Sequence, residues 1–379
     1  MKVAVFTDTF LPQVNGVART IGRLADALTK QNIPCMVLAP DTGLSENSNY
    51  PIYTAPGLDL PIYRECKIAL PSYSEICSRL AFFKPDIVHL ATEFSMGLAG
   101  LKYASSVNLP VVSSYTTNFP QYLSYYKLGI FSPWAWKYLR WFHNQCHRNY
   151  CPSLSTLQLL EKNGIQNLAI WGRGIDTTFY NPDKYDAAFR TSVGAADKTL
   201  LLYVGRLAAE KDLDILMESF IQLNKNDPDY HLIITGDGPL SDQLKQSAPA
   251  NVTFTGYLQG EDLTRAYASS DIFVFPSTTE TFGNVILEAM ASGLPVVAPA
   301  SGGIKENLVD RYNGMSCRPR SVKDMVLSIR ELKKNQALRR TLAAQARTFS
   351  MTKSWDEVFR GLINSYQEII DNNVAVKAV

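Results

Sequence analysis

The chain has 379 residues, of which 46% are hydrophobic and 19% are charged, and its formal net charge is +2. This length exceeds that of one ordinary domain and predicts two. The composition is typical of a globular protein with substantial hydrophobic cores, and the near-neutral charge argues against a nucleic-acid partner.

Membrane and compartment signals in the sequence are few. No apolar run approaches the roughly 18 residues of a membrane span, and Met1 and Lys2 lead directly into an apolar strand rather than a signal peptide. The six cysteines are scattered, without a CxxC pair or a zinc-binding spacing. We therefore expect a reduced, cytoplasmic protein without a metal site, whose membrane contact would be peripheral and at the inner face.

Apolar strands and helices alternate along the first half of the chain. Strands are predicted at 2–6, 34–39, 86–90, 110–114 and 149–151, and helices at 17–31, 75–83, 96–106, 134–149 and 155–163. Residues 40–72 are polar and contain proline, so no element is predicted there. The alternation is typical of an α/β domain with a mostly parallel, doubly wound sheet.

A second alternation follows after a break. Between 171 and 197 glycines and a proline with few apolar runs predict a linker or hinge. Further strands are predicted at 199–204, 230–235, 252–255, 272–276 and 296–298, with a helix at 212–224 and a helical end over 322–371 that is interrupted at 353–355. We assign residues 1–170 to the first domain, 198–350 to the second and 351–379 to a C-terminal helix. Two such domains would face a cleft, the usual place for a small-molecule site.

The stretch from 278 to 299 is the most informative in the chain. Glu280 and Glu288 lie eight residues apart, with Phe282-Gly283-Asn284 between them, after a predicted strand and at the start of a helix. Open α/β sheets bind ligands at the carboxyl ends of their strands, and helix starts attract anions. Two carboxylates placed there can bind the hydroxyls of a polyol; the alternative is a pair of solvated glutamates.

A possible diphosphate clamp follows the first strand of the second domain. Gly205 and Arg206 end that strand, and Lys211 stands five residues after the arginine. The glycine permits close approach of a ligand, the arginine offers a planar fork and the lysine a compact charge. A surface loop with two solvated cations is the alternative.

Glycine turns follow other predicted strands. Asn15-Gly16 opens the first helix, Gly236-Asp237 follows the strand at 230–235, and Gly256-Tyr257 follows the next strand. Backbone N–H groups at such turns can donate hydrogen bonds to a phosphate or line the pocket of a nucleotide base. None matches GxGxxG, so a dinucleotide site is poorly supported. Each turn by itself is also compatible with an ordinary loop.

Aromatic residues gather in two segments of the first half. Residues 115–126 combine polar groups with tyrosines after a strand and could bind a sugar or an acceptor. A stripe at helical spacing follows, with basic neighbours: Trp134, Tyr138, Trp141 and Phe142, beside Lys137, Arg140 and Arg148. This stripe predicts either a membrane-surface or acceptor face or ordinary core packing.

Together these segments resemble glycosyltransferase family 4, a family of retaining transferases with the two-domain GT-B fold. The resemblance covers essentially the whole chain and is specific at 205–211 (GRLAAEK), 236–239 (GDGP), 280–298 (ETFGNVILEAMASGLPVVA) and the loop at 15–17. Residues 171–176 (WGRGID) and 117–126 (TNFPQYLSYY) look like the diacylglycerol glucosyl- and sulfoquinovosyltransferases and the related GDP-mannose-dependent α-mannosyltransferases. The resemblance implies two Rossmann-like domains facing a cleft, with the C-terminal helix returning to the first domain.

The resemblance also implies roles for individual residues. Arg206 and Lys211 would hold the diphosphate of a UDP- or GDP-sugar, and Glu288 would bind its ribose. Glu280 and the backbone of 282–284 would orient the transferred sugar. Fixed cations stabilise a leaving diphosphate without a metal ion, so no cofactor is implied. The remaining donor-site residues would be Asn15, Gly16, Gly205, Gly236, Asp237, Gly256 and Tyr257.

One residue departs from the family pattern. Thr116 stands where the family usually has histidine, in what is normally a Tyr-His-Thr-Asn sequence. Threonine can donate and accept a hydrogen bond but cannot carry a positive charge. We place Thr116 among the catalytic residues and expect altered sugar selectivity or reduced activity.

Three functions are compatible with this sequence. The first is a hexosyltransferase that uses a UDP-glucose-type or GDP-mannose donor and a glycerolipid or other glycan acceptor. The second is a nucleotide-sugar epimerase or hydrolase of the same architecture. The third is a catalytically weakened sugar-nucleotide-binding protein, which the threonine at position 116 suggests.

Overall fold

The computed structural model describes residues 1–13, 15–41, 48–60, 63–126 and 128–377. The chain divides into two compact units. The first comprises Met1–Asn118, Phe131–Gly172 and Asp356–Val379, and the second comprises Phe119–Ile130 and Arg173–Trp355. Each unit is built on its own parallel sheet, which confirms the predicted α/β class with two Rossmann-like domains.

The sheet of the first unit has seven strands in the order β3-β2-β1-β6-β7-β8-β9. They are β1 (Val3–Phe6), β2 (Cys35–Pro40), β3 (Ile52–Ala55), β6 (Ile87–Leu90), β7 (Val111–Ser114), β8 (Arg148–Cys151) and β9 (Leu168–Ile170). Every residue of β1, β2, β6 and β7 is buried. Continuous burial is expected of parallel strands that helices cover on both faces.

Polar side chains cap the starts of three helices of the first unit. The helices of this unit are α1 (Gly16–Lys30), α2 (Tyr73–Phe83), α3 (Ser95–Ser106), α5 (Ser132–His143), α6 (Leu154–Lys162) and α14 (Trp355–Lys377). The side chains of Asn15, Ser72 and Ser153 accept hydrogen bonds from the first-turn N–H groups of α1, α2 and α6. Such caps satisfy N–H groups that have no partner within the helix.

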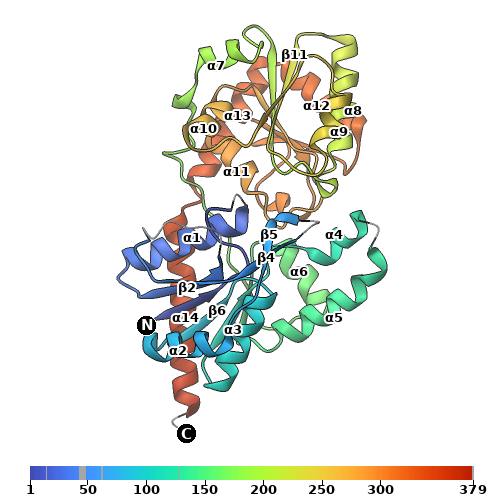
Figure 1. Cartoon of the computed structure of the whole chain (residues 1–379). Helices are drawn as coiled ribbons and strands as arrows, with labels where there is room; N and C mark the ends of the chain where they lie inside the picture. The colour runs from blue at the N-terminus through green and yellow to red at the C-terminus, as the bar shows by residue number, and fades with distance from the viewer. Residues whose placement is uncertain (14, 42–47, 61–62, 127, 378–379) are drawn as a thin grey trace. The chain divides into compact units, whose positions relative to one another are not determined.

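The last helix, α14, packs on the first unit, where the C-terminus also lies (Figure 1). The hydroxyl of Tyr366 lies 2.5 Å from Nδ1 of His89, whose Nε2 lies 2.6 Å from the hydroxyl of Ser114. All three side chains are buried. His89 therefore joins the end of the chain to strands β6 and β7 through both ring nitrogens, a structural role.

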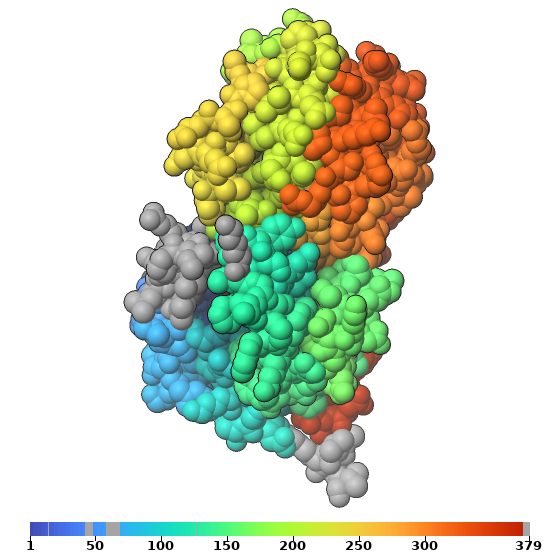
Figure 2. Space-filling model, turned by 90° about the vertical axis from the view of Figure 1, so that its right-hand side faces the viewer, coloured from blue at the N-terminus to red at the C-terminus, as the bar shows by residue number. Residues whose placement is uncertain are grey.

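The second unit holds a six-stranded parallel sheet in the order β12-β11-β10-β13-β14-β15. Its strands are β10 (Thr199–Val204), β11 (Tyr230–Thr235), β12 (Val252–Gly256), β13 (Ile272–Val274), β14 (Val296–Pro299) and β15 (Gly314–Cys317). Its helices are α4 (Phe119–Tyr125), α7 (Ala187–Ser192), α8 (Leu213–Asn226), α9 (Ser241–Ser247), α10 (Gly260–Ala268), α11 (Asn284–Ala291), α12 (Val322–Lys334) and α13 (Gln336–Met351). Short 3-10 turns are η1 (Gly129–Phe131), η2 (Pro182–Lys184), η3 (Ala209–Lys211) and η4 (Gly302–Glu306). Figure 2 shows α12 and α13, in orange to red, at the surface of this unit.

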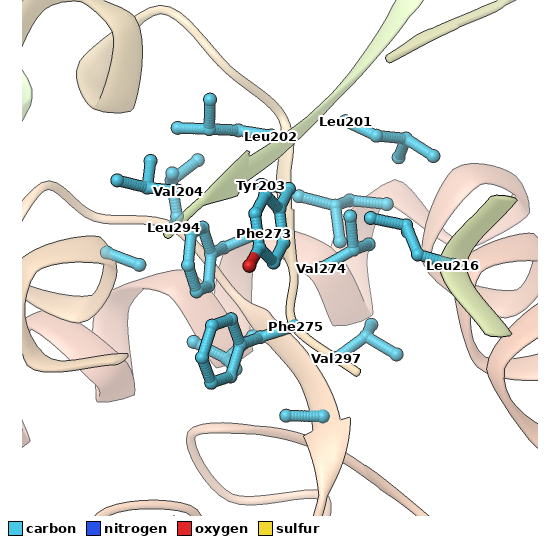
Figure 3. Close-up of a cluster of buried hydrophobic side chains, with 14 of the residues drawn as sticks. Leu201, Leu202, Tyr203, Val204, Leu216, Phe273, Val274, Phe275, Leu294 and Val297 are labelled. Atoms are coloured by element: carbon cyan, nitrogen blue, oxygen red, sulfur yellow. The ribbon is translucent and has the colours of Figure 1, made fainter. Parts of the chain in front are cut away.

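Aromatic stacking lies at the centre of the second unit's core (Figure 3). The ring centroids of Tyr203 and Phe275 are 5.8 Å apart, and those of Phe273 and Phe275 are 5.9 Å apart, with near-parallel planes. Aliphatic side chains such as Leu216 and Val297 surround them. This packing holds the ends of β10 and β13 together.

Several elements differ from the prediction. The polar stretch at 40–72 contains β3 and an antiparallel pair formed by β4 (Gly57–Leu60) and β5 (Tyr63–Ala69). Helix α5 ends at His143, not at 149, because Arg148 already pairs with Val112 of β7. Helix α4 and strand β15 also lack a sequence signal strong enough to predict them. Edge strands and short helices gain their stability from neighbours that are distant in sequence.

Candidate functional site

The order of strands fixes where a ligand is expected in the second unit. From β10 the chain first adds β11 and β12 on one side and then β13, β14 and β15 on the other. The strand order therefore reverses between β10 and β13. In open α/β sheets the crevice at such a switch point, beyond the carboxyl ends of the strands, is the usual ligand site. Lys211 follows β10, and Glu280 follows β13.

Lys211 and Glu280 form a close ion pair. Nζ of Lys211 lies 2.5 Å from Oε1 of Glu280, and the two side chains are 14% and 15% exposed. The hydroxyl of Ser277 donates to the same carboxylate oxygen at 3.1 Å. Burial lowers the pKa of Lys211, but the carboxylate of Glu280 and the phenols of Tyr122 and Tyr203 together outweigh burial and raise that pKa well above its usual value. The lysine is a fixed cation at neutral pH.

A second set of contacts holds the two loops together. The backbone carbonyl of Glu210 accepts a hydrogen bond from the hydroxyl of Thr279 at 2.9 Å. Asp212, which is fully buried, accepts bonds from the backbone N–H and the hydroxyl of Thr278 at 3.0 and 2.7 Å. Arg320 pairs with the other oxygen of Asp212. These bonds fix the position of Lys211 relative to Glu280.

Helix α4 and the residue after it supply three tyrosines to the same loops. The hydroxyl of Tyr126 donates to Oε2 of Glu210 at 2.9 Å, and that of Tyr125 lies 3.1 Å from the hydroxyl of Thr278. Tyr122 is hydrogen-bonded to Thr279, and its phenol interacts electrostatically with Lys211. Burial and then Glu210 raise the pKa of Tyr126 to about 12, so this tyrosine stays protonated. The sequence pattern placed these tyrosines near a sugar or acceptor without indicating their partners.

The glycine turns predicted after β10, β11 and β12 are hydrogen-bonded to one another. The N–H of Leu207 donates to the carbonyl of Asp237 at 2.9 Å, and the N–H of Gly236 donates to the carbonyl of Gly256 at 2.8 Å. Gly236 has a φ of +131°, and a Cβ there would lie 2.0 Å from the carbonyl oxygen of Gly205. Only glycine fits this close approach. Tyr257, which is 42% exposed, stands at the end of this series.

The loop between β13 and α11 packs on a second pair of glycines. A Cβ at Gly302 would lie 2.5 Å from the carbonyl oxygen of Glu280, and one at Gly303 would lie 2.1 Å from that of Thr281. Gly283 caps α11 in the left-handed region, with a φ of +81°. Glu280 is thus held on a tightly supported loop directly before a helix start, as predicted from the sequence.

Glu288 lies on α11 itself. Because this helix begins at Asn284, Glu288 is its fifth residue, about one turn from the start. Its Oε2 accepts a hydrogen bond of 2.9 Å from the hydroxyl of Tyr267 on α10. Arg206 follows β10 and is partly buried, and its backbone carbonyl accepts a bond from the hydroxyl of Tyr203.

The candidate residues of the first unit lie on loops after β1 and β7. Asn15 accepts a hydrogen bond from the N–H of Ala18 at 2.8 Å, so its side chain caps α1, and Gly16 is exposed at the first position of that helix. Asp8, on the same loop after β1, is buried and accepts bonds from Thr92, Ser95 and the N–H of Met96. Thr116 is partly buried in the segment after β7.

Comparison with known proteins identifies the family. Residues 14–179 match the model of Glycosyltransferase Family 4, and residues 186–349 match the model of Glycosyl transferases group 1. A GDP-mannose-dependent alpha-mannosyltransferase of Mycolicibacterium smegmatis is 32% identical over 98% of this chain and 98% of its own length. The chain belongs to glycosyltransferase family 4. This confirms the resemblance inferred from the sequence.

Two further known proteins are similar to this family 4 glycosyltransferase. An alpha-monoglucosyldiacylglycerol synthase of Streptococcus pneumoniae is 29% identical over 83% of this chain and 74% of its own length. The crystal structure of the Anabaena protein HepE in complex with UDP and glucose superimposes with a TM-score of 0.78, at 19% identity, over 97% of this chain and 99% of that chain. The latter likeness supports the fold.

The aromatic stripe of this glycosyltransferase divides between core and surface. Phe142 is fully buried, and Tyr138 donates its hydroxyl to the backbone carbonyl of Glu93. Trp134 and Trp141 of the same stripe, by contrast, are 71% and 51% exposed. Core packing therefore holds for Tyr138 and Phe142, while a membrane-surface or acceptor face remains a prediction for the exposed tryptophans.

The described residues were searched for groups that could bind a metal ion and for helices that could cross a membrane. Within the described ranges of the glycosyltransferase, no group of three His, Cys, Asp or Glu side chains is placed to hold a metal ion. Likewise, no helix in the part of the chain that the structure describes is long and apolar enough to cross a bilayer. Five cysteines are free thiols, and the side chain of Cys66 lies outside the described residues.

Sequence reasoning missed several residues that build the site of this glycosyltransferase. Asp212 and Arg320 join loops that are 108 residues apart, and Tyr267 reaches Glu288 from another helix. Neither pair has a spacing in the sequence from which the contact could be predicted. The acidic residue directly after Lys211 was a visible signal, since a buried carboxylate beside a predicted cation requires its own partners.

Proposed function

We propose that this protein transfers a hexose from a nucleotide-diphosphate sugar, UDP-glucose-type or GDP-mannose, to a hydroxyl of a glycerolipid or another glycan. The observation that carries the proposal is the pairing of Lys211 with Glu280 at the switch point between β10 and β13. It puts a cation and a polyol-binding carboxylate side by side, which suits a sugar joined to a diphosphate. The names of the relatives support the donor and acceptor classes.

In this proposal Lys211 and Arg206 hold the donor diphosphate. Negative charge develops on the diphosphate as its bond to the sugar breaks, and preorganised cations in a partly buried site stabilise that charge. The position of Lys211 is fixed before the donor binds because Asp212 and Thr278 hold the loop that carries it. We therefore propose that the reaction requires no metal ion.

The remaining donor contacts are assigned by position along the switch point. Glu280 and the backbone of 282–284 orient the hexose, and Glu288 binds the ribose. The hydrogen-bonded turns after β10, β11 and β12 line the base, and the family resemblance assigns the loop at 15–17 to the donor phosphate as well. The residues assigned to the turns and that loop are Gly205, Gly236, Asp237, Gly256, Tyr257, Asn15 and Gly16.

We propose that the transfer retains the configuration of the sugar. The bond between the anomeric carbon and the leaving phosphate oxygen breaks, and the acceptor oxygen forms its bond on the same face. The proton of the acceptor hydroxyl passes to a leaving phosphate oxygen, so no separate protein base is needed. Glu280 then acts by binding hydroxyls, since its carboxylate is already engaged with Lys211 and Ser277. Thr116 would lie near the transferred sugar.

A lipid acceptor requires contact with a membrane surface, and α5 offers one. Phe131, Trp134 and Trp141 are exposed at helical spacing, and Lys137 and Arg140 are exposed on the same helix. Exposed aromatic side chains beside basic ones suit the interface of an anionic bilayer. We propose peripheral association through this face at the cytoplasmic side, which the free thiols of the described cysteines also support.

The test is to incubate the protein with UDP- and GDP-linked hexoses, with and without diacylglycerol vesicles, and to follow both nucleotide release and glycosylated product. Product with an axial linkage from an axial donor supports a retaining transferase. Release without product would instead support a hydrolase or epimerase, and tight binding without release would support a binding protein. If Lys211→Ala and Glu288→Ala each change turnover and donor affinity by less than about tenfold, or about 1.4 kcal/mol, the site is misplaced.

A further inference from the structure

The second unit contains a buried tyrosine whose hydroxyl is directed at a proposed donor-binding carboxylate. Tyr267, near the end of α10, has no exposed surface. Its hydroxyl donates a hydrogen bond of 2.9 Å to Oε2 of Glu288 on α11. Glu288 itself is only partly buried, so the bond joins the core to a side chain that reaches the surface.

The ring of Tyr267 is held from two sides. Its centroid lies 5.7 Å from that of Tyr180, edge to face, and 5.7 Å from that of Phe273 on β13. These contacts leave the phenol little freedom, so its hydroxyl is a donor at a fixed point. The flexible glutamate side chain takes its position from this donor, because a charge-assisted hydrogen bond is stronger than a neutral one.

We infer that Tyr267 is a positioning residue for the donor nucleotide: it fixes Oε2 of Glu288 so that Oε1 is presented to a ribose hydroxyl. Within the described part of the chain, Oε1 of Glu288 accepts no hydrogen bond from another residue. One carboxylate oxygen is thus anchored in the core while the other is available to a ligand. This inference rests on the proposed function, which assigns Glu288 to the ribose.

The hydrogen bond between Tyr267 and Glu288 also has a simpler, purely structural explanation. A buried tyrosine hydroxyl requires an acceptor, and Glu288 satisfies it whether or not a nucleotide binds. The two explanations differ in which nucleotides are affected when the hydroxyl is removed. Loss of a positioning bond weakens only ligands that carry the ribose hydroxyl, whereas local structural damage weakens all ligands alike.

The test measures binding of UDP and GDP by calorimetry, and then binding of the 2′-deoxy and 3′-deoxy forms of the tighter one. Tyr267→Phe keeps the ring and its contacts with Tyr180 and Phe273. We expect this variant to bind the ribonucleotide about three- to tenfold more weakly, the scale of one partly lost hydrogen bond to a charged group. Binding of at least one deoxy form should change by less than about twofold, and the double variant with Glu288→Ala should be no weaker than Glu288→Ala alone.

Tyr366→Phe is the matched control, because it removes an equally buried hydroxyl in the first unit and should leave nucleotide affinity unchanged. Equal losses for ribo- and deoxynucleotides in Tyr267→Phe, or no loss at all, would overturn the positioning role while leaving the proposed function intact. If Glu288→Ala still distinguishes ribo- from deoxynucleotides as the natural protein does, the ribose assignment itself is wrong and the inference fails with it.

Discussion

Lys211 and Glu280 are 69 residues apart in sequence, and their side chains meet at 2.5 Å. The first follows β10 and the second follows β13, the two strands between which the order of the sheet reverses. The pair is mostly shielded from solvent. Removing one partner of such a pair leaves a costly buried charge, whereas replacing both can be nearly neutral for stability.

Substitutions of this pair can therefore distinguish its effect on stability from its effect on catalysis. Lys211→Met alone should lower the free energy of unfolding by about 3 kcal/mol and lower kcat on the order of a hundredfold. The double variant Lys211→Met with Glu280→Gln should regain most of the stability, because no charge is left buried. It should regain none of the turnover. Denaturant unfolding and steady-state kinetics check both parts, and recovery of turnover in the double variant would contradict a role for the cation in catalysis.

The close approach of Gly236 to Gly205 predicts a position-specific effect of an added methyl group. Gly236→Ala should lower the free energy of unfolding by more than about 2 kcal/mol and weaken donor binding, because the turn must move. Gly256→Ala is the control: its φ is also positive, at +69°, but a Cβ there meets nothing within 4 Å. It should cost only about 1 kcal/mol, the left-handed strain alone. If urea unfolding shows the same loss of unfolding free energy for both variants, the loss comes from backbone strain and not from the contact with Gly205.

Position 116 offers a gain-of-function test. Thr116→His restores the residue usual in the family, and we expect it to raise kcat with the preferred donor without changing the affinity for the free nucleotide. Thr116→Ala should lower kcat, since it removes the remaining hydrogen-bonding group. Kinetics with a panel of nucleotide sugars also reveal a change of sugar preference. If neither substitution alters kcat or preference, Thr116 does not approach the sugar.

The exposed face of α5 predicts binding to anionic membranes. Replacing both Trp134 and Trp141 by serine should reduce sedimentation with phosphatidylglycerol vesicles about tenfold or more, since each ring contributes buried area at the interface. Binding should also weaken with added salt because of Lys137 and Arg140. Ile221→Ser on α8, which removes a side chain that is 46% exposed, is the control. Unchanged sedimentation of the double variant would rule out this face.

The start of α12 predicts a pH dependence of stability. Hydrogen bonds from Arg318, at 2.6 and 2.9 Å, lower the pKa of Asp324 to about 2. A carboxyl group whose pKa is depressed by folding stabilises the folded state above its unfolded pKa, about 3.9. That contribution is lost as the pH falls towards 2. Asp324→Asn should therefore cost about 1 kcal/mol or less at pH 7, because the exposed arginine is screened by solvent.

Denaturant unfolding of natural protein and Asp324→Asn at several pH values checks this prediction. The difference between them should be constant between pH 5 and pH 7 and should shrink below pH 4. A difference that persists at pH 3 and below would mean that the carboxylate charge is not what stabilises this helix start.

The sequence by itself determined most strands of the two parallel sheets and the residue types available at the candidate site. Strands such as 199–204 and 230–235 are apolar runs bounded by glycine turns, and these signals are local. Gly236 could be predicted at a strand end because no other residue type suits a turn of that kind. The carboxylates at 280 and 288 and the cations at 206 and 211 were visible from residue type and spacing alone.

Only the tertiary structure decided which of these residues meet. The sequences of β10 and β13 do not by themselves predict that these strands are neighbours, since pairing depends on complementary burial across the whole sheet. That pairing brings Lys211 to Glu280, and other tertiary contacts give Asp212 its partner Arg320 and place the hydroxyl of Tyr267 on Glu288. The same reason explains the missed edge strand β3 and helix α4: each is stabilised by partners elsewhere in the chain, not by a pattern of its own.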